Sequence, residues 1–279
     1  MEASLQSSKV PKNQAKVKEA IREKVRNFVG EYQKRDGIET DWGTPLIGFA
    51  SSEDPLFAHL RKVVSATHAV PTDLLEEAKT VVAFFLPFRK AMTSTNRQLR
   101  NCSEPWVVAY LETNEMIRQL SLSLQSFIDS EGHKTVVIPA THNFDKKRLI
   151  SDWSHRHVAY IAGLGSFGLN NMLITEKGCC GRVGTFVTSA EIPPDARCSE
   201  PACLHKYDGS CGKCARRCVN EALFDNSFDR FACYEMCLEN DKRHRSLGFA
   251  DVCGKCLVAV PCSHTNPVLK KRTREKTVR

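Results

Sequence analysis

The spacing of hydrophobic residues predicts helices in the first part of the chain. Between residues 13 and 35, apolar side chains recur at intervals of three and four, with Lys, Arg and Glu between them: Val17, Ile21, Val25, Phe28, Val29 and Tyr32. This period predicts an amphipathic helix with one face against a core, ended by Asp36 and Gly37. A second helix is expected to begin after residues 51–55.

The middle of the chain alternates between short apolar runs and helical patterns. Residues 80–86 are apolar and partly β-branched, which predicts a buried strand closed by Pro87. Helices are predicted over residues 104–131 and 153–162, and strands over 135–138, 172–175 and 184–188, the last two paired with each other. The alternation predicts an α/β (α+β) domain over residues 1–192.

The composition changes near Pro193 and Pro194, beyond which the chain is rich in Cys, Gly, Asp and Asn. Of thirteen cysteines, all but Cys102 fall between Cys179 and Cys262. We expect residues 193–265 to form a small metal-dependent domain, because few apolar stretches remain to build a core. Residues 266–279 complete the chain as a basic tail, expected to be disordered, and the basic residues near the N-terminus are expected to form a solvated helix face.

The placement of the protein in the cell bears on the chemistry of its cysteines. No apolar run reaches the roughly 18 to 20 residues of a membrane helix, so no membrane association is expected. The N-terminus lacks the apolar region and cleavage site of a secretory signal, which predicts a cytoplasmic protein. In a reducing compartment, thirteen cysteines indicate metal binding or redox chemistry rather than disulfides.

The cysteines form two groups with ferredoxin-like spacing. The groups are Cys203-x7-Cys211-x2-Cys214-x3-Cys218 and Cys233-x19-Cys253-x2-Cys256-x5-Cys262. The first contains most of the bacterial ferredoxin run, and eight thiolates suit two [4Fe-4S] clusters. A single four-cysteine zinc site built from the two Cys-x2-Cys pairs is the alternative, but it leaves the other four cysteines unused. Spacing alone does not decide between Cys233 and Cys237 as a ligand, and Cys179 and Cys180 are interpreted as small buried residues.

A glycine motif, Gly163-Leu-Gly165-Ser-Phe-Gly168, matches G-x-G-x-x-G. A dinucleotide-binding motif must follow a strand and open a helix, whereas the residues before this motif have helical spacing. We therefore expect the glycines to permit a sharp turn close to a ligand or another backbone. His155 and Arg156, just before the motif, are interpreted equally well as structural side chains or as groups that face a ligand.

Three segments together resemble the epoxyqueuosine reductases, a family related to the catalytic core of reductive dehalogenases. They are HVAYIAGLGSFGLNNMLIT, GCCGRVGTFVT and the cysteine-rich segment 203–262, with VVAYLETNEMI (residues 107–117) as the best match in the first half. The resemblance implies a nitroreductase-like N-terminal domain that binds a corrinoid (cobalamin), followed by a ferredoxin-like domain. Tyr110, His155, Arg156 and the three glycines are our candidates for contact with the corrinoid.

The resemblance also implies which cysteines hold each cluster. One cluster would be held by Cys203, Cys211, Cys214 and Cys262, and the other by Cys218, Cys233, Cys253 and Cys256. The family's proton-donating Asp corresponds to Leu149 here, so the nearest acid, Asp152, is the candidate catalytic residue. The helical repeats with which longer members grip tRNA are missing, so stable tRNA binding is not expected.

The sequence therefore predicts an iron–sulfur oxidoreductase that passes low-potential electrons through two [4Fe-4S] clusters to a corrinoid or similar cofactor. An external donor such as a ferredoxin or flavodoxin would supply the electrons. The substrate would be a small molecule or modified nucleoside that the sequence does not identify. Two alternatives are an electron-transfer protein that reduces a corrinoid without an organic substrate of its own, and a zinc-stabilised protein that binds nucleic acid through its basic ends.

Overall fold

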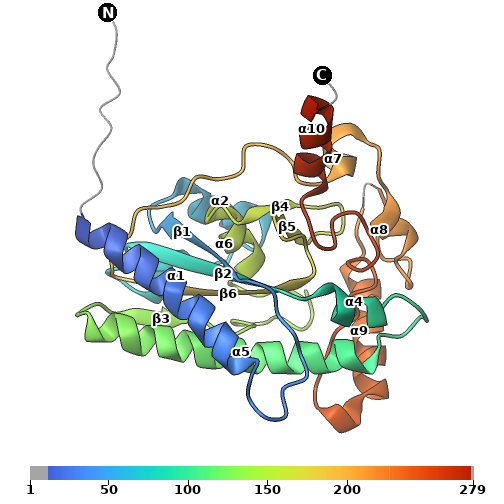
Figure 1. Ribbon diagram of the computed structural model, residues 1–279, viewed down its shortest axis with the longest axis horizontal. Helices are drawn as coiled ribbons and strands as arrows, with labels where there is room; N and C mark the ends of the chain where they lie inside the picture. The colour runs from blue at the N-terminus through green and yellow to red at the C-terminus, as the bar shows by residue number, and fades with distance from the viewer. Residues whose placement is uncertain (1–11, 226, 278–279) are drawn as a thin grey trace, which may run out of the picture.

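The computed structural model describes residues 12–225 and 227–277 and has a mixed α/β fold (Figure 1). Its first part contains α1 (Lys12–Tyr32), β1 (Leu46–Ser51), α2 (Pro55–Val63), α3 (Pro71–Leu74), β2 (Thr80–Pro87), α4 (Lys90–Thr95), α5 (Glu104–Ser130), β3 (Thr135–Val137), α6 (His155–Ile161), β4 (Gly165–Phe167), β5 (Leu173–Thr175) and β6 (Gly181–Thr188). The second part contains α7 (Leu204–Asp208), α8 (Lys213–Arg216), α9 (Arg230–Arg243), a short 3-10 turn (Arg245–Leu247) and α10 (Pro267–Thr277). In the described part of the chain, no helix is long and apolar enough to cross a membrane.

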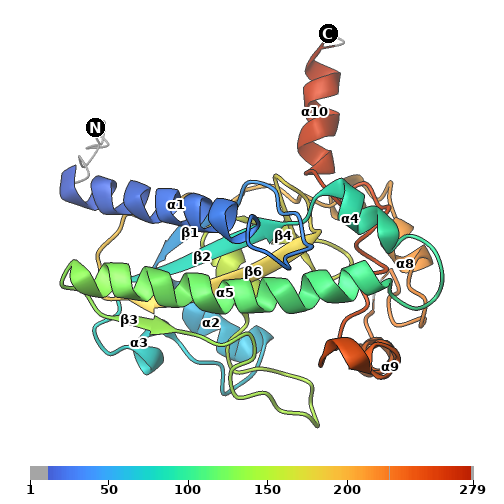
Figure 2. The ribbon, with the colours of Figure 1, turned by 60° about the horizontal axis from the view of Figure 1, so that its bottom comes forward.

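A four-stranded antiparallel sheet in the order β1-β2-β6-β3 lies at the centre of the first part. Helices α1 and α5 cover one face of the sheet and α2 and α6 cover the other (Figures 1 and 2). The central strand β2 is buried along its whole length, and its side chains alternate between the two cores. Val82, Phe84 and Leu86 join the core beneath α1 and α5, and Val81, Ala83 and Phe85 join the other.

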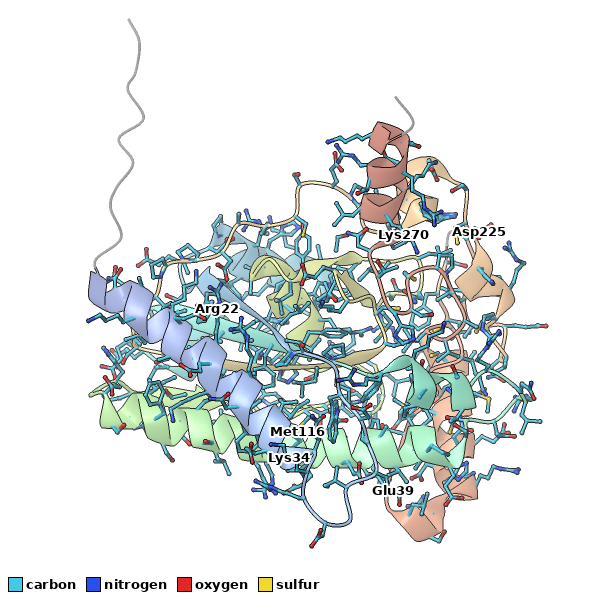
Figure 3. The ribbon with its side chains drawn as sticks, in the orientation of Figure 1. Arg22, Lys34, Glu39, Met116, Asp225 and Lys270 are labelled. Atoms are coloured by element: carbon cyan, nitrogen blue, oxygen red, sulfur yellow. The ribbon has the colours of Figure 1, made fainter. Side chains whose placement is uncertain are left out.

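The two helices on the first face confirm the helical patterns in the sequence. Ile21 and Val25 of α1 are fully buried, as is Met116 of α5, which is labelled in Figure 3. At the polar edge of α1, Lys18 and Arg22 form ion pairs with Asp195 at 2.6 and 3.2 Å. These pairs attach the start of the cysteine-rich part to the first helix.

The predicted pairing of residues 172–175 with residues 184–188 is wrong. Strand β5 pairs instead with β4, so that Gly165 lies opposite Thr175, while β6 pairs with β2 and β3 in the main sheet. The glycine motif was not expected to form a strand, because strands are usually rich in β-branched and aromatic residues. Strand β1 was also not predicted.

The cysteine-rich part is made of helices and loops that pack beside α4 and the start of α5 (Figure 2). Ala202, Leu257 and Val258 of this part belong to the core beneath α1 and α5. The apolar core of the first part therefore extends into the cysteine-rich loops. Attachment to that core compensates for the few apolar residues of this part.

The expectation of a disordered tail from residue 266 is wrong for residues 267–277, which form α10. The Asn266 side chain accepts hydrogen bonds from the backbone N–H groups of Val268 and Leu269 at 3.0 and 3.2 Å, which caps the helix. Lys271 pairs with Asp208 of α7 at 2.5 Å, and Val268 is buried. Beyond this base α10 extends away from the body of the protein (Figure 2). Residues 278 and 279 of the predicted tail lie outside the described part.

Candidate functional site

Four cysteines from distant parts of the chain line one cavity beside β5. They are Cys203 before α7, Cys211 before α8, Cys214 within α8 and Cys262 before α10. The rest of the lining is largely apolar and includes Gly168, Leu169, Ile174 and Val260. Burial, together with the neighbouring sulfurs of Cys262 and Cys203, raises the pKa of Cys214 to about 12. Neighbouring thiols that raise one another's pKa can all lose their protons only if a positively charged centre balances the negative charges that result.

A second set of cysteines lies next to this cavity. Burial raises the pKa of Cys256, and the sulfurs of Cys253 and Cys233 raise it further. The Cys218 sulfur also raises the pKa of Cys256 and that of Cys253. Such electrostatic effects between thiols require them to be near neighbours. The structure therefore brings together the four cysteines of the second predicted set: Cys218, Cys233, Cys253 and Cys256.

Cys237 lies one helical turn after Cys233 on α9 and interacts with it. A hydrogen bond from the Cys237 thiol lowers the pKa of Cys233 to about 7 and raises that of Cys237. The two sulfurs are therefore close neighbours that do not ionise independently. The choice between Cys233 and Cys237 as a metal ligand stays open.

The remaining cysteines occupy different environments. Cys179 and Cys180 are buried, as predicted, and Cys102 is buried at the start of α5. Cys198 is exposed, with its sulfur 3.8 Å from the Gly163 carbonyl oxygen. No three or more His, Cys, Asp or Glu side chains within the described ranges are arranged to hold a single metal ion.

A group of polar side chains converges near the second set of cysteines. The Tyr110 hydroxyl on α5 donates a hydrogen bond to Asp251 Oδ1 at 2.5 Å, and the Arg182 guanidinium of β6 lies 4.3 Å from the centre of the Tyr110 ring. Burial raises the pKa of Tyr110 to about 12, against the opposing effect of Arg182. The Arg182 Nε atom is buried and has no hydrogen-bond partner among the residues that the structure describes. This group can therefore offer a buried N–H donor to a ligand.

Arg156 on α6 connects this group to the cysteines. Its side chain is exposed to solvent, yet burial lowers the pKa of its guanidinium, and nearby Cys233 and Cys256 oppose that shift. The guanidinium is therefore close to two cysteines of the second set. Arg156 Nη1 also donates to the Asn171 carbonyl at 2.6 Å, which holds the guanidinium in place. Tyr110, Arg156, Arg182 and Asp251 are together called the polar site, which lies beside the second set of cysteines.

His155 points elsewhere and is fully engaged within the chain. Its Nε2 is 2.9 Å from the Pro139 carbonyl oxygen, and its Nδ1 is 2.8 Å from the Thr185 hydroxyl. Burial lowers its pKa to about 4, so the ring is neutral at neutral pH. With both nitrogens occupied, the geometry favours the structural interpretation of His155 over the one in which it faces a ligand.

Contacts within the protein account for the glycines of the motif. A side chain at Gly165 would place a Cβ 2.2 Å from the Ile174 carbonyl oxygen of the paired strand, and one at Gly163 would lie 2.5 Å from the Ala196 carbonyl oxygen. Gly163 also has a φ of +80°, in the region that glycine adopts most readily. Gly168 lines the cavity of the first four cysteines. Contact of these glycines with a corrinoid stays a prediction.

Asp152 is held in the loop that precedes α6. Its carboxylate accepts a hydrogen bond from the Thr67 hydroxyl at 2.5 Å, and its backbone bonds to Ala69 and His142. The bonds to Thr67 and Ala69 attach this loop to the segment between α2 and α3. Leu149 lies in the same loop with a φ of +53°. A catalytic role for Asp152 stays a prediction, and its contacts favour a structural role.

Sequence analysis missed two residues of the polar site, Arg182 and Asp251. The available signal for Arg182 was a single charged residue within an otherwise apolar strand, since a buried charge needs a partner or a ligand. Asp251 lies two positions before Cys253, in a segment that was considered only for its cysteines. Their proximity depends on how α5, β6 and the cysteine loops pack, which local patterns do not reveal.

Comparison with known proteins gives structural neighbours only. No family model matches the chain, and no curated protein does. A crystal structure of an epoxyqueuosine reductase is similar over 87% of this chain and 66% of its own, with 21% identity and a TM-score of 0.54. The enzyme from Bacillus subtilis gives a TM-score of 0.55 at the same identity and coverage. A reductive dehalogenase, described with a B12-dependent mechanism, is similar over 87% of this chain and 32% of its own, with 16% identity and a TM-score of 0.52.

These neighbours confirm the resemblance seen in the sequence at the level of the fold. At such identities the likeness concerns the fold, and it extends through both the sheet and the cysteine-rich part because 87% of the chain is covered. The chain spans 66% of the length of these epoxyqueuosine reductases and 32% of the dehalogenase. Function must therefore be argued from the site.

Proposed function

We propose that this chain is an iron–sulfur oxidoreductase similar to the epoxyqueuosine reductases. In this proposal a ferredoxin-like part binds two [4Fe-4S] clusters and passes single electrons to a corrinoid at the polar site of a nitroreductase-like part. An external low-potential donor, such as a ferredoxin or flavodoxin, supplies the electrons. The observation that carries the proposal is the cavity lined by Cys203, Cys211, Cys214 and Cys262, the set that the family resemblance assigns to one cluster.

The chemistry of this cavity suits a cluster better than a zinc ion. A zinc site takes four sulfurs around one ion, and a single such site would leave four of the eight grouped cysteines without a ligand role. The four thiols instead surround a shared space with largely apolar walls. Thiolates are the ligands of iron–sulfur clusters, and an apolar surrounding helps to set the potential. The cluster supplies one-electron chemistry, and the chain supplies the ligands and excludes water.

The polar site offers groups for a cofactor and a substrate. A corrinoid bound there would provide the reducing centre for the chemistry, as the B12-dependent dehalogenase suggests. Arg182 would donate its Nε–H to a bound group, and Tyr110 is held by Asp251 so that its ring and hydroxyl keep one orientation. Arg156 lies close to the second set of cysteines, so its positive charge would favour an electron arriving there.

The cluster assignment is tested by metal analysis of single variants. Anaerobically reconstituted protein should contain about eight iron and eight sulfide ions per chain. Cys214→Ala and Cys256→Ala should each lose about half of both, because each removes a ligand of one cluster. Cys198→Ala, which removes an exposed thiol, should keep the full content. A protein that binds zinc without sulfide, or a Cys214→Ala variant with full iron content, contradicts the proposal.

One observation favours an electron-transfer protein that reduces a corrinoid without its own organic substrate. The proton donor expected in the loop before α6 is replaced by Leu149, and the Asp152 carboxylate is bound to Thr67. Loss of a placed acid costs about 10² to 10⁴ in rate. We therefore expect reconstituted protein to reduce added cobalamin, seen in the corrin absorbance, and to convert epoxyqueuosine in tRNA slowly or not at all. Efficient conversion to queuosine would show that another group delivers the proton and would exclude this second function.

A further inference from the structure

Cys179 lies beside Cys262 because two backbone segments approach unusually closely. The Cys179 N–H donates to the Cys262 carbonyl at 2.9 Å, and the Cys180 N–H donates to the Ser263 carbonyl at 3.0 Å. Gly178 permits this approach, since its φ is +82° and a Cβ there would lie 2.4 Å from the Ser263 carbonyl oxygen. The position of Cys179 relative to Cys262 is therefore fixed by the backbone.

The two side chains are also in contact. The Cys179 thiol donates toward the Cys262 sulfur across 3.9 Å, within the range of a hydrogen bond between sulfurs. On its other side the Cys179 sulfur accepts from Asn170 Nδ2 at 4.0 Å, and the same amide nitrogen is 3.3 Å from the Cys256 carbonyl oxygen. Cys179 is 1% exposed, so water does not compete for these bonds. The Asn170 amide polarises the thiol and strengthens its donation to Cys262.

We propose that Cys179 is a positioning residue that acts through Cys262 and raises the reduction potential of the first cluster. This inference rests on the proposed function, in which Cys262 is a ligand of that cluster. Reduction adds negative charge that is shared with the ligand sulfurs. A hydrogen bond to such a sulfur is therefore stronger in the reduced state, and it stabilises that state over the oxidised one.

The neighbouring residue provides a matched control. Cys180 is as buried as Cys179, but its thiol donates to the Leu257 carbonyl oxygen at 3.2 Å and not to a predicted ligand. Replacing either residue with alanine removes one buried sulfur from the same strand end. Only the replacement of Cys179 removes a hydrogen bond to Cys262.

The experiment uses anaerobically reconstituted full-length protein as wild type, Cys179→Ala, Cys179→Ser and Cys180→Ala. Iron and sulfide are counted, and each cluster is titrated with dithionite while its electron paramagnetic resonance signal is followed. The first cluster is identified by the signal that Cys214→Ala loses. In Cys179→Ala we expect that signal's midpoint to become more negative by about 59 mV, which is a tenfold change for one electron. Cys179→Ser keeps a donor and should shift less, and Cys180→Ala should match wild type.

Each other result overturns one specific idea. If wild type binds no cluster, the proposed function fails, and the inference fails with it. If wild type holds both clusters but Cys179→Ala leaves the potential unchanged, only the inference fails. Only the inference fails, too, if Cys179→Ser and Cys179→Ala shift the midpoint potential equally, because the shift then comes from a change in packing and not from a lost hydrogen bond. Loss of iron in Cys179→Ala but not in Cys180→Ala would make Cys179 a ligand and overturn its role as a donor.

Discussion

At the scale of single residues, the hydrogen-bond chain through His155 fixes its protonation state. The Pro139 carbonyl can only accept, so Nε2 carries the proton and Nδ1 accepts from the Thr185 hydroxyl. The Thr185 oxygen in turn accepts from the Trp153 indole N–H at 2.9 Å. Each group in this chain is satisfied with a neutral ring. A second proton on His155 would leave the Thr185 hydroxyl without its acceptor.

This arrangement predicts a loss of stability in mild acid. The pKa of His155 falls from 6.5 to about 4 on folding, so between these values the unfolded chain binds the proton more readily. The stabilisation is complete above pH 6.5 and is lost as the pH falls toward 4, by up to about 3 kcal/mol. Urea unfolding at several pH values should show this decline for wild type and a weaker one for His155→Gln. His59→Gln, at an exposed histidine, should retain the wild-type decline, and an unchanged slope in His155→Gln would contradict the assignment.

The two Cys-Gly-Lys-Cys motifs use their lysines differently. Lys213 in the first motif is exposed, whereas Lys255 in the second is 1% exposed. Lys255 Nζ donates to the carbonyl oxygens of Asn96 and Gln98 at 3.0 and 2.7 Å. The lysine therefore ties the second motif to the segment that follows α4.

Removal of this amine should destabilise the protein. Lys255→Met keeps the length of the side chain but leaves two carbonyl groups without their donor, at a cost of about 1 to 3 kcal/mol. Lys213→Met should change the free energy of unfolding by less than about 0.5 kcal/mol, as is usual for a surface substitution. Chemical denaturation of the two variants under the same conditions measures the difference. Equal effects would show that the buried contacts of Lys255 contribute little.

At the scale of elements, the sequence predicted what local periodicity determines. Helices α1 and α5 and strand β2 follow from their apolar patterns, and their observed bounds lie close to the predicted ones. Strand pairing was missed because it joins distant residues, and the glycine motif gave no strand signal. Similarly, the family resemblance divided eight cysteines into two sets, and the structure brings the members of each set near one another. Their role as cluster ligands stays a prediction. The polar site around Arg182 depends on packing between three elements, which local patterns do not reveal. The contact of Gly165 with Ile174 also means that Gly165→Val disrupts the β4–β5 pair directly, so it cannot isolate an effect on a cofactor.

Helix α9 offers a test of how firmly Cys233 is held. The Asp229 carboxylate caps this helix by accepting from the backbone N–H groups of Phe231 and Ala232 at 2.8 and 3.0 Å. Asp229→Ala should cost about 1 kcal/mol and loosen the first turn, where Cys233 lies. Amide hydrogen exchange over residues 230–234 should become faster than in Glu235→Ala, which alters an exposed position of the same helix. Unchanged exchange would show that tertiary contacts hold this turn without its cap.

At the scale of the whole molecule, the two parts differ in what stabilises them. The sheet and its helices bury large apolar cores on both faces, whereas α7 and α8 bury little apolar surface. We therefore expect iron removal by a chelator to unfold the region after Pro193 and to leave most of the helical circular dichroism intact. Limited proteolysis should then cut within residues 193–265. Loss of the whole helical signal on chelation would show that both parts unfold as one unit.

Helix α5 belongs to the first part, and its start contacts the cysteine-rich part. Its 27 residues span about 40 Å. Near its start the Trp106 ring lies against Gly254, and one turn later Tyr110 meets Asp251. Its remaining turns pack on α1 and the sheet. The spacing between these two contacts is thus set by the continuous backbone hydrogen bonds of one helix. In the proposed function, electrons that enter at the cysteines would need no diffusive closure of the protein to reach the polar site, so their transfer rate should be insensitive to the viscosity of the solvent.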